Sequence, residues 1–381
     1  MSEQWRTTTL GESCIMYQPK TITRKEMSID GEYPVYGANG VIGYYSEFNH
    51  EDSQLIIGCR GSVGAVHITE SKSWINGNAM VIQSKKEDIS QAFLRYLFLG
   101  GIDISNSISG SAQPQITRRS LAPVEFSYPI NMEEQQRIVS ILDQVYRDVE
   151  FRIEKNNEKL ENAREMSQNI LNSAFENNDW NFAILEEILS VQPRNGWSPP
   201  AVFHSDSGTP VLTLSSVTGN VFKADQYKFT SAPVDPQRHY WVENGDLLIT
   251  RSNTPKLVGH VAIASGINIP TIYSDLIMRM NPDSEKVLTK FLYYQMQSKL
   301  LREEIMGRAK GANPTMVKIN KKSLQSIPIY FPSLEKQEII INFIEQLFQH
   351  IRELEAVFHE EASALSEFKQ SILQEAFNGN L

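Results

Sequence analysis

The sequence predicts a mixed α/β protein made of two globular heads of short strands, each followed by one long helix. Residues 113–176 and 313–378 repeat one another, both repeats end in a long helical pattern, and short strands punctuated by glycine precede them. The offset between the copies is constant from Gln135 and Gln337 onward. Two copies of one unit imply two copies of one task.

The start of each half repeats as well. Trp5 and Leu10 match Trp180 and Leu185 at the same internal spacing. The second head is about 27 residues longer, because the offset grows from 175 at the tryptophans to 202 in the helices. We therefore expect a common scaffold with two different reading faces.

The expected division of the chain has four parts. A first head covers 1–131 and a first long helix covers 132–177. A second head covers 178–333 and a second long helix covers 334–381.

The helical pattern is strong in both copies. Apolar residues recur every three or four positions over 138–170 and 340–372, or about six heptads, which is typical of a coiled coil. Pro129 and Pro332 precede the two starts, and the segment 378–380, Asn-Gly-Asn, provides a C-terminal stop. At 1.5 Å per residue each helix is about 66 Å long.

An antiparallel pairing of the two helices would place the heads at opposite ends, because each helix follows its own head. A span of about 66 Å corresponds to roughly 20 base pairs, so the heads could reach DNA half-sites about one helical turn apart. Asn156 occupies a seam position where the other copy has Phe358. We expect a solvated defect there, with a device that fixes the register as the alternative.

Composition limits the classes of protein. The chain has 381 residues, 41% of them hydrophobic, which is enough for several cores. It has no apolar run long enough to cross a bilayer and no signal sequence, so we expect a soluble, cytoplasmic protein without membrane contact. Cys14 and Cys59 lack metal-ligand spacing and are predicted to be reduced core thiols.

The net charge of −9 is unevenly distributed. Residues 132–177 carry ten acids and six bases, and residues 334–381 carry nine acids and three bases. The heads are therefore close to neutral, the first slightly acidic and the second slightly basic. Such heads on acidic helices are compatible with DNA binding by the heads.

Signatures of catalysis fail on inspection. The glycine-rich turn at 58–66 lacks the Gly-Lys-Ser/Thr of a phosphate-binding loop. The segment 198–201, Ser-Pro-Pro-Ala, approaches a methyltransferase motif, but Ala201 cannot stack on a flipped base, so we interpret it as a turn. Seven scattered histidines form no metal motif. The chain is predicted to be no enzyme and to hold no metal.

Several segments resemble those of type I restriction-modification specificity subunits. They are the segment 33–40, Tyr-Pro-Val-Tyr-Gly-Ala-Asn-Gly, the turn 60–64, Arg-Gly-Ser-Val-Gly, and the twin helix starts at 129–135 and 332–337. The resemblance covers essentially the whole chain in the order head, helix, head, helix. Thr209-Pro210-Val211 stands where the first head has Tyr-Pro-Val, but a different sequence follows it, so the second head should read a different DNA sequence.

The resemblance implies a DNA reader without catalytic activity, in a system that defends against phage. Each head would be a target recognition domain built on a twisted β-sheet, and each would recognise one half of a split, asymmetric site in double-stranded DNA. The paired helices would set the spacer and dock two adenine methyltransferase subunits, which use S-adenosylmethionine. Restriction subunits that translocate DNA with ATP and Mg would join them, so the chain itself would carry no cofactor.

Candidate DNA contacts follow from chemistry, since Arg and Lys suit guanine or phosphate, Asn suits adenine, and Ser suits phosphate. The alternative for each is a solvated loop residue, and for the two tryptophans a place in the core. In the first head, all in expected polar turns, the candidates are Lys20, Arg24, Lys25, Asn39, Arg60, Trp74 and Asn76. In the second head they are Arg194, Trp197, Ser215, Arg251, Asn253, Lys256, Tyr273, Arg308 and Lys310.

Two basic pairs form a separate group. Arg118-Arg119 and Lys321-Lys322 occupy the same place in the repeat, between head and helix. Equivalent basic pairs suit a sequence-independent task such as holding phosphates. The alternative to a DNA reader is a two-headed adaptor that assembles proteins without contacting DNA.

Overall fold

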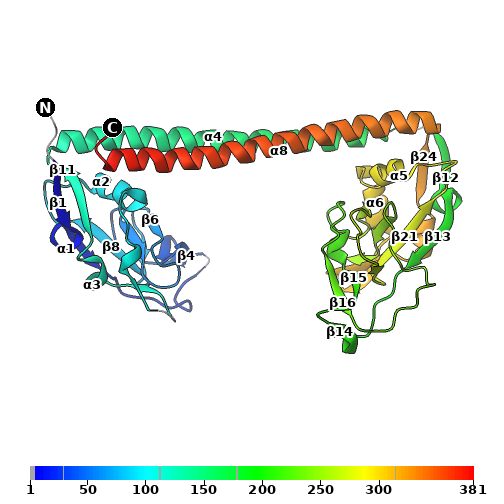
Figure 1. Ribbon diagram of the computed structural model, residues 1–381, viewed down its shortest axis with the longest axis horizontal. Coiled ribbons are helices and arrows are strands. Elements are labelled where there is room, and N and C mark those ends of the chain that lie inside the picture. The colour runs from blue at the N-terminus through cyan, green and yellow to red at the C-terminus, as the bar shows by residue number, and fades with distance from the viewer. Residues whose placement is uncertain (1–4, 29, 111–112, 177–178, 314) are drawn as a thin grey trace. The chain divides into compact units, whose positions relative to one another are not determined.

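The computed structural model describes residues 5–28, 30–110, 113–176, 179–313 and 315–381. The chain forms two compact units, each with one head and part of both long helices (Figure 1). The first unit is Met1–Asn157 with Val357–Leu381, and the second is Glu158–Ala356. These units cut across both helices, whereas the sequence-based division keeps each helix whole.

The first head contains two main sheets. One has four strands in the order β2-β8-β5-β6, and the other has three in the order β4-β3-β7. Two strand pairs, β1-β11 and β9-β10, complete the head. The strands are β1 (Trp5–Thr9), β2 (Cys14–Tyr17), β3 (Tyr33–Gly37), β4 (Gly40–Tyr45), β5 (Leu55–Gly58), β6 (Val66–Ile68), β7 (Trp74–Ile75), β8 (Ala79–Ser84), β9 (Ile108–Ser109), β10 (Gln115–Ile116) and β11 (Glu125–Pro129). Its short helices are α1 (Leu10–Ser13), α2 (Gln91–Tyr96), η1 (Leu97–Gly101), η2 (Ser105–Ser107) and α3 (Arg118–Leu121).

The second head repeats this plan. Its sheets have the orders β13-β21-β17-β19, β14-β16-β15-β20 and β18-β23-β22, and the pair β12-β24 closes it. The strands are β12 (Asn181–Ile184), β13 (Leu189–Asn195), β14 (His204–Ser205), β15 (Thr209–Leu212), β16 (Tyr227–Thr230), β17 (Leu247–Thr250), β18 (Ser252–Asn253), β19 (Val261–Ile263), β20 (Ile272–Tyr273), β21 (Ile277–Pro282), β22 (Lys310–Asn313), β23 (Met316–Lys318) and β24 (Pro328–Phe331). Its short helices are η3 (Leu185–Ile188), η4 (Ala201–Phe203), η5 (Leu214–Ser216), α5 (Thr289–Gln295), α6 (Lys299–Arg308) and α7 (Lys321–Gln325).

The duplication seen in the sequence extends to strand pairing. The sheet β2-β8-β5-β6 corresponds strand by strand to β13-β21-β17-β19, and the parallel pair β3-β7 corresponds to β15-β20. Leu10 and Leu185 are both fully buried. Their N–H groups donate to Val124 O and Ile327 O, each at 2.9 Å. The match of the two tryptophan-to-leucine segments is therefore confirmed in three dimensions.

The long helices are α4 (Met132–Ala174) and α8 (Leu334–Phe377), which start where the sequence predicts. Acidic side chains lie in their first turns, where they interact favourably with the helix dipole. After α8 the chain turns at Gly379, whose φ of +76° favours glycine. Residues 177 and 178, after α4, lie outside the described residues.

Within each unit, α4 and α8 run antiparallel. In the first unit Lys369 Nζ lies 3.3 Å from Glu150 Oε1, and Arg152 pairs with Glu361 nearer the middle of both helices. In the second unit Arg164 Nη2 lies 2.7 Å from Glu355 Oε1. Charged pairs thus flank the apolar seam along both parts of the helix pair.

The expected solvated defect at Asn156 is wrong. The side chain is only 7% exposed, and its Nδ2 donates to Glu361 Oε2 at 2.7 Å. A buried polar residue with a specific partner agrees with the alternative interpretation, and its role in fixing the register stays a prediction. Leu354 belongs to the apolar repeat predicted over 340–372, but it is 40% exposed and lies outside the buried seam.

Each head packs its main core against the helices of its own unit. Ile138 and Leu142 of α4, with Leu373 of α8, belong to the core of the first head. Leu171 of α4 and Ile344 of α8 belong to that of the second. The long helices, where the two copies of the repeat align without gaps, therefore also provide the surface against which each head packs.

Both cysteines are free and buried, as predicted. Burial raises the pKa of the Cys14 thiol to about 12, and it raises the pKa of Cys59 as well. The thiolate is the reactive form of cysteine, so both side chains behave as core residues.

Candidate nucleic-acid interface

Three loops meet at one end of the four-stranded sheet of the first head. A Cβ at Gly58 would lie 2.1 Å from Ser62 O and 2.6 Å from Ala38 O, so only glycine allows the two turns to approach so closely. Arg60, in the turn after β5, forms a β-bridge with Gln115 of the β9–β10 hairpin. The structure thereby brings the loops that carry Asn39 and Arg60 together.

The second head has the same contact between a turn and a hairpin. We call this contact the joint: it pairs Arg60 with Gln115 in the first head and Ser252 with Lys318 in the second. In the first head Ile116 N–H donates to Cys59 O at 3.0 Å, and in the second Ile319 N–H donates to Arg251 O at 2.9 Å. Arg251 is therefore the counterpart of buried Cys59, and Ser252 is the counterpart of Arg60. Arg60 and Arg251 each lie in a turn that follows a buried strand, but their positions in the repeat differ by one residue.

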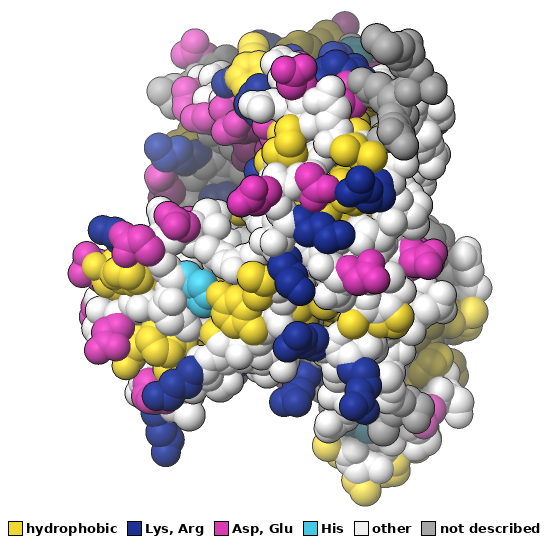
Figure 2. Space-filling model, turned by 90° about the vertical axis from the view of Figure 1, so that its left-hand side faces the viewer, with side chains coloured by type: hydrophobic (Ala, Val, Ile, Leu, Met, Phe, Trp, Pro, Cys, Tyr) yellow, Lys and Arg dark blue, Asp and Glu magenta, His cyan; other side chains and the backbone are white. Residues whose placement is uncertain are grey.

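Most of the predicted contact residues lie on the surface. On the face seen in Figure 2, Lys and Arg side chains form a band down the middle. A basic surface of this kind suits the phosphates of nucleic acid. The exposed candidates are Lys20, Arg24, Lys25, Asn39, Arg60, Arg118, Arg119, Arg194, Ser215, Lys256, Lys310, Lys321 and Lys322.

Four candidates are half-buried and already have partners. Trp197 stacks on Tyr240 with ring centroids 5.7 Å apart. Asn253 donates to Thr218 Oγ1 at 3.2 Å. Arg308 Nη2 lies 2.7 Å from Glu304 Oε2, and Arg251 Nη1 lies 3.4 Å from Asp275 O. These side chains must exchange existing contacts to reach a ligand.

Three candidates are buried: Trp74, Asn76 and Tyr273. The expectation that Trp74 and Asn76 lie in exposed polar turns is wrong, and Trp74 takes the core position that was its alternative. Trp74 is in strand β7 and donates to Lys20 O, while Asn76 is 3% exposed and hydrogen-bonds both backbone groups of Ile22. Tyr273, in β20, is fully buried and donates to Arg194 O. Their polar atoms hold the loops that carry exposed candidates, and burial raises the pKa of Tyr273 to about 12.

The two basic pairs begin equivalent short helices. Thr117 caps α3 by accepting from Ser120 N at 3.1 Å, and Asn320 caps α7 by accepting from Ser323 N at 2.8 Å. Arg118-Arg119 and Lys321-Lys322 are the first two residues of those helices and are exposed. The caps fix the direction in which each pair leaves the head.

The joint adds two residues that the sequence interpretation missed. Gln115 is paired with Arg60 across the joint of the first head. Lys318 is paired with Ser252 across the joint of the second. Each stands two residues before the cap of the following short helix, and that shared spacing was the available signal.

A cleft of about 620 Å³ opens beside β15 and β16 in the second head. Ser215 and Ser198 line it, and the Ser198 hydroxyl donates to the Asp275 carboxylate. Residues 198–200 belong to no helix or strand, and Ala201 begins η4.

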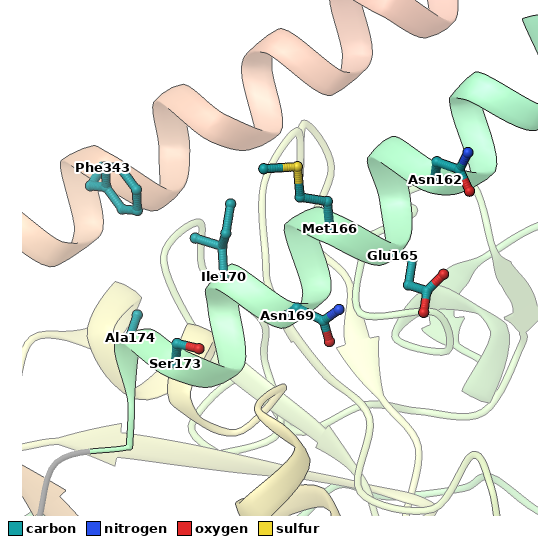
Figure 3. Close-up of a pocket in the computed structure, with 8 residues that line it drawn as sticks. All are labelled: Asn162, Glu165, Met166, Asn169, Ile170, Ser173, Ala174 and Phe343. Carbon is teal, nitrogen blue, oxygen red and sulfur yellow. The ribbon is translucent and has the colours of Figure 1, made fainter.

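An open groove of about 640 Å³ lies between α4 and α8 of the second unit. Figure 3 shows Met166 and Ile170 of α4 directed toward Phe343 of α8. Met166 is 65% exposed and Phe343 is 53% exposed. Such an exposed apolar surface on a helix pair is typical of a protein interface.

Within the described ranges, no three His, Cys, Asp or Glu side chains are grouped so that they could hold a metal ion. None of the helices in those ranges combines the length and apolar character needed to cross a membrane.

Comparison with known proteins identifies the family. The model of the type I restriction modification DNA specificity domain matches residues 2–162 and again 177–361. The chain belongs to the type I restriction-modification specificity family. This assignment confirms the resemblance found in the sequence and gives the protein a role in DNA sequence specificity.

Relatives extend over nearly the whole chain. The Escherichia coli type I restriction enzyme EcoDI specificity subunit is 22% identical over 99% of this chain and 88% of its own. A type I specificity subunit of Haemophilus influenzae is 23% identical over 85% of this chain and 82% of its own.

Solved structures share the fold of this specificity protein. The HsdS subunit from Thermoanaerobacter tengcongensis is 20% identical, with a TM-score of 0.56 over 99% of this chain and 97% of its own. A chain from a study of type I restriction-modification complex assembly has a TM-score of 0.73 at 20% identity, covering 99% and 98%. These likenesses confirm the predicted mixed helix-and-sheet fold with two heads.

Proposed function

We propose that each head binds one half of a divided, asymmetric site in double-stranded DNA. The observation that carries this proposal is the joint between turn and hairpin, which has the same backbone pairing in both heads but different side chains. Arg60 and Gln115 stand where the second head has Ser252 and Lys318. A conserved frame with exchanged polar groups is what two readers of different sequences require.

The proposal extends to protein partners on the long helices. The apolar groove lined by Met166, Ile170 and Phe343 supports docking of an adenine methyltransferase subunit on the second unit. In the first unit, Phe368 occupies the position in the repeat that Met166 occupies in the second unit, and it is 48% exposed. Two equivalent surfaces would recruit two copies of the same subunit, with restriction subunits joining that assembly.

Chemistry belongs to those partners in this proposal. The two thiols are buried and burial raises the pKa of both, so neither is a reactive thiolate. S-adenosylmethionine, ATP and Mg would be bound by the methyltransferase and restriction subunits. The specificity chain would contribute binding and orientation.

Copurification tests the partner part of the proposal. The full chain, coexpressed with the adenine methyltransferase subunit of its own system, should purify with two copies of it. Met166→Glu and Phe368→Glu should each reduce the ratio toward one, because each places a charge in one docking surface. Val202→Glu, at a side chain that is 82% exposed on the second head, serves as the control.

DNA binding separates a reader from an adaptor. The purified assembly should prefer duplexes that contain one divided sequence over duplexes of equal length without it, and binding should weaken with salt. An assembly that forms normally but binds no duplex DNA would establish the adaptor instead.

A further inference from the structure

The hairpin β22–β23 of the second head carries two lysines directly opposite each other. The strand register pairs Lys310 with Lys318, and both side chains are exposed. Side chains in directly opposed positions have Cβ atoms about 4.5–5.5 Å apart, and like charges there are destabilising. A negatively charged group close to both lysines would offset this repulsion.

That partner is not supplied by the described part of the chain. No ion pair there involves Lys310 or Lys318, whereas Lys286 and Lys290 of the same head pair with Asp283 and Glu345. On its other side β23 pairs Lys318 with Ser252, a neutral residue. The row of three side chains across the sheet therefore carries two positive charges and no negative one.

The corresponding row in the first head is different. Gln115 pairs with Ser109 on one side and with Arg60 on the other, so this row carries one positive charge. In both heads the strand in the middle of the row is followed along the chain by a helix-capping residue and then by the exposed basic pair. The second head thus presents four cations, at Lys310, Lys318, Lys321 and Lys322, on one short segment.

We propose that the Lys310–Lys318 pair is a binding site for the phosphate backbone of DNA, and that the first head lacks this lysine pair at the corresponding row. This inference rests on the proposed function, since it places DNA on the second head. Lysine is a compact point charge suited to phosphate, and it carries no sequence information in that contact. The pair would add to affinity for every DNA sequence and would not select among sequences.

Salt dependence of binding is the direct test. The full chain in its assembly with the methyltransferase subunits is titrated with a duplex of random sequence at several salt concentrations. The double substitution Lys310→Gln and Lys318→Gln should reduce the magnitude of the negative slope of log affinity against log salt by about 1 to 2, because each phosphate contact contributes about 0.9. Lys310→Arg with Lys318→Arg should retain the slope.

The control removes the same charge elsewhere on the head. Lys286→Gln with Lys290→Gln eliminates two lysines that are paired with carboxylates, so the slope should hardly change. Equal losses for the two glutamine pairs, or no loss for Lys310 and Lys318, would overturn the inference. Lys318→Gln alone gives the same decision if the double variant does not fold. An unmodified assembly that binds no duplex DNA would instead refute the proposed function.

Discussion

Gln135 and Gln337 make the same three hydrogen bonds in the two heads. Gln135 Oε1 accepts from Ser90 N at 2.8 Å, and its Nε2 donates to Asp88 O and Pro129 O at 2.7 and 2.8 Å. Gln337 likewise accepts from Leu288 N at 2.9 Å and donates to Lys286 O and Pro332 O at 2.8 and 3.0 Å. Both side chains are fully buried, so each ties the start of a long helix to its own head.

The first prediction concerns this tie. Gln135→Leu should destabilise the chain by about 3 kcal/mol, because it leaves buried backbone groups without partners. Gln337→Leu should cost a similar amount in the second head. Urea denaturation measures both, and Gln136→Leu, at the exposed neighbouring position, should change little. Similar curves for Gln135→Leu and Gln136→Leu would show that the tie contributes nothing.

Asn156 offers a test of register in the helix pair. Asn156→Asp should destabilise the first unit by about 2–4 kcal/mol at pH 7, because it places a buried carboxylate against Glu361. Repulsion raises the pKa of the introduced carboxyl, so the loss should shrink as pH falls through that pKa. Asn156→Leu, which keeps the bulk and adds no charge, should cost much less. Thermal unfolding at pH 7 and pH 4.5 distinguishes these outcomes, and a pH-independent loss in Asn156→Asp would argue against direct contact with Glu361.

His260 predicts a pH dependence of stability in the second head. Its burial, together with the neighbouring Arg302 guanidinium, lowers the pKa to about 4. Its Nδ1 accepts a hydrogen bond from Gly219 N at 2.9 Å, which requires that nitrogen to be unprotonated. The unfolded chain therefore binds the proton at higher pH than the fold does. Stability should be constant above about pH 6.5 and decrease toward pH 4, by at most about 3 kcal/mol.

Comparison of two histidine variants isolates that effect. His260→Gln should flatten the change in urea midpoint between pH 7.5 and pH 5, because the side chain at position 260 then no longer titrates. His204→Gln, at an exposed position of the same head, should retain the profile of the unmodified protein. Parallel profiles for all three proteins would exclude His260 as the source.

The basic pairs predict a change in affinity without a change in specificity. Replacement of Arg118-Arg119 or Lys321-Lys322 by alanine should weaken binding to all duplexes and flatten the salt dependence, because phosphate contacts carry no sequence information. The preference for the divided site should persist. Filter binding at several salt concentrations measures this, and loss of preference at an unchanged salt slope is the contrary result.

The repeat in the sequence predicts the fold to a large extent. The spacing from Gln135 and from Gln337 is free of gaps, so the helix starts at Met132 and Leu334 could be predicted from the pattern. The division into compact units could not. Packing of both helices against each head decides it, and that packing involves residues distant in sequence.

Prediction of the site was less complete. Charged residues in polar turns are exposed by default, so the exposure of Arg60 and Lys256 could be predicted from type and context, and their contact with DNA stays a prediction. Asn76 and Tyr273 were misassigned, because their polar atoms bind backbone groups of loops far away in the chain. Lys318 was missed because its pairing with Lys310 depends on strand register, which composition does not reveal.

A map of methylated adenines tests the division of labour between the heads most directly. Long-read sequencing of DNA from a host that carries this chain and its methyltransferase should show modification at one asymmetric motif of two short sequences separated by an unspecified spacer. Arg251→Ala should relax the sequence of one half only and leave the other half and the spacer unchanged. A continuous motif, or uniform loss of modification in Arg251→Ala without relaxed sequence preference, would contradict the assignment of one half-site to each head.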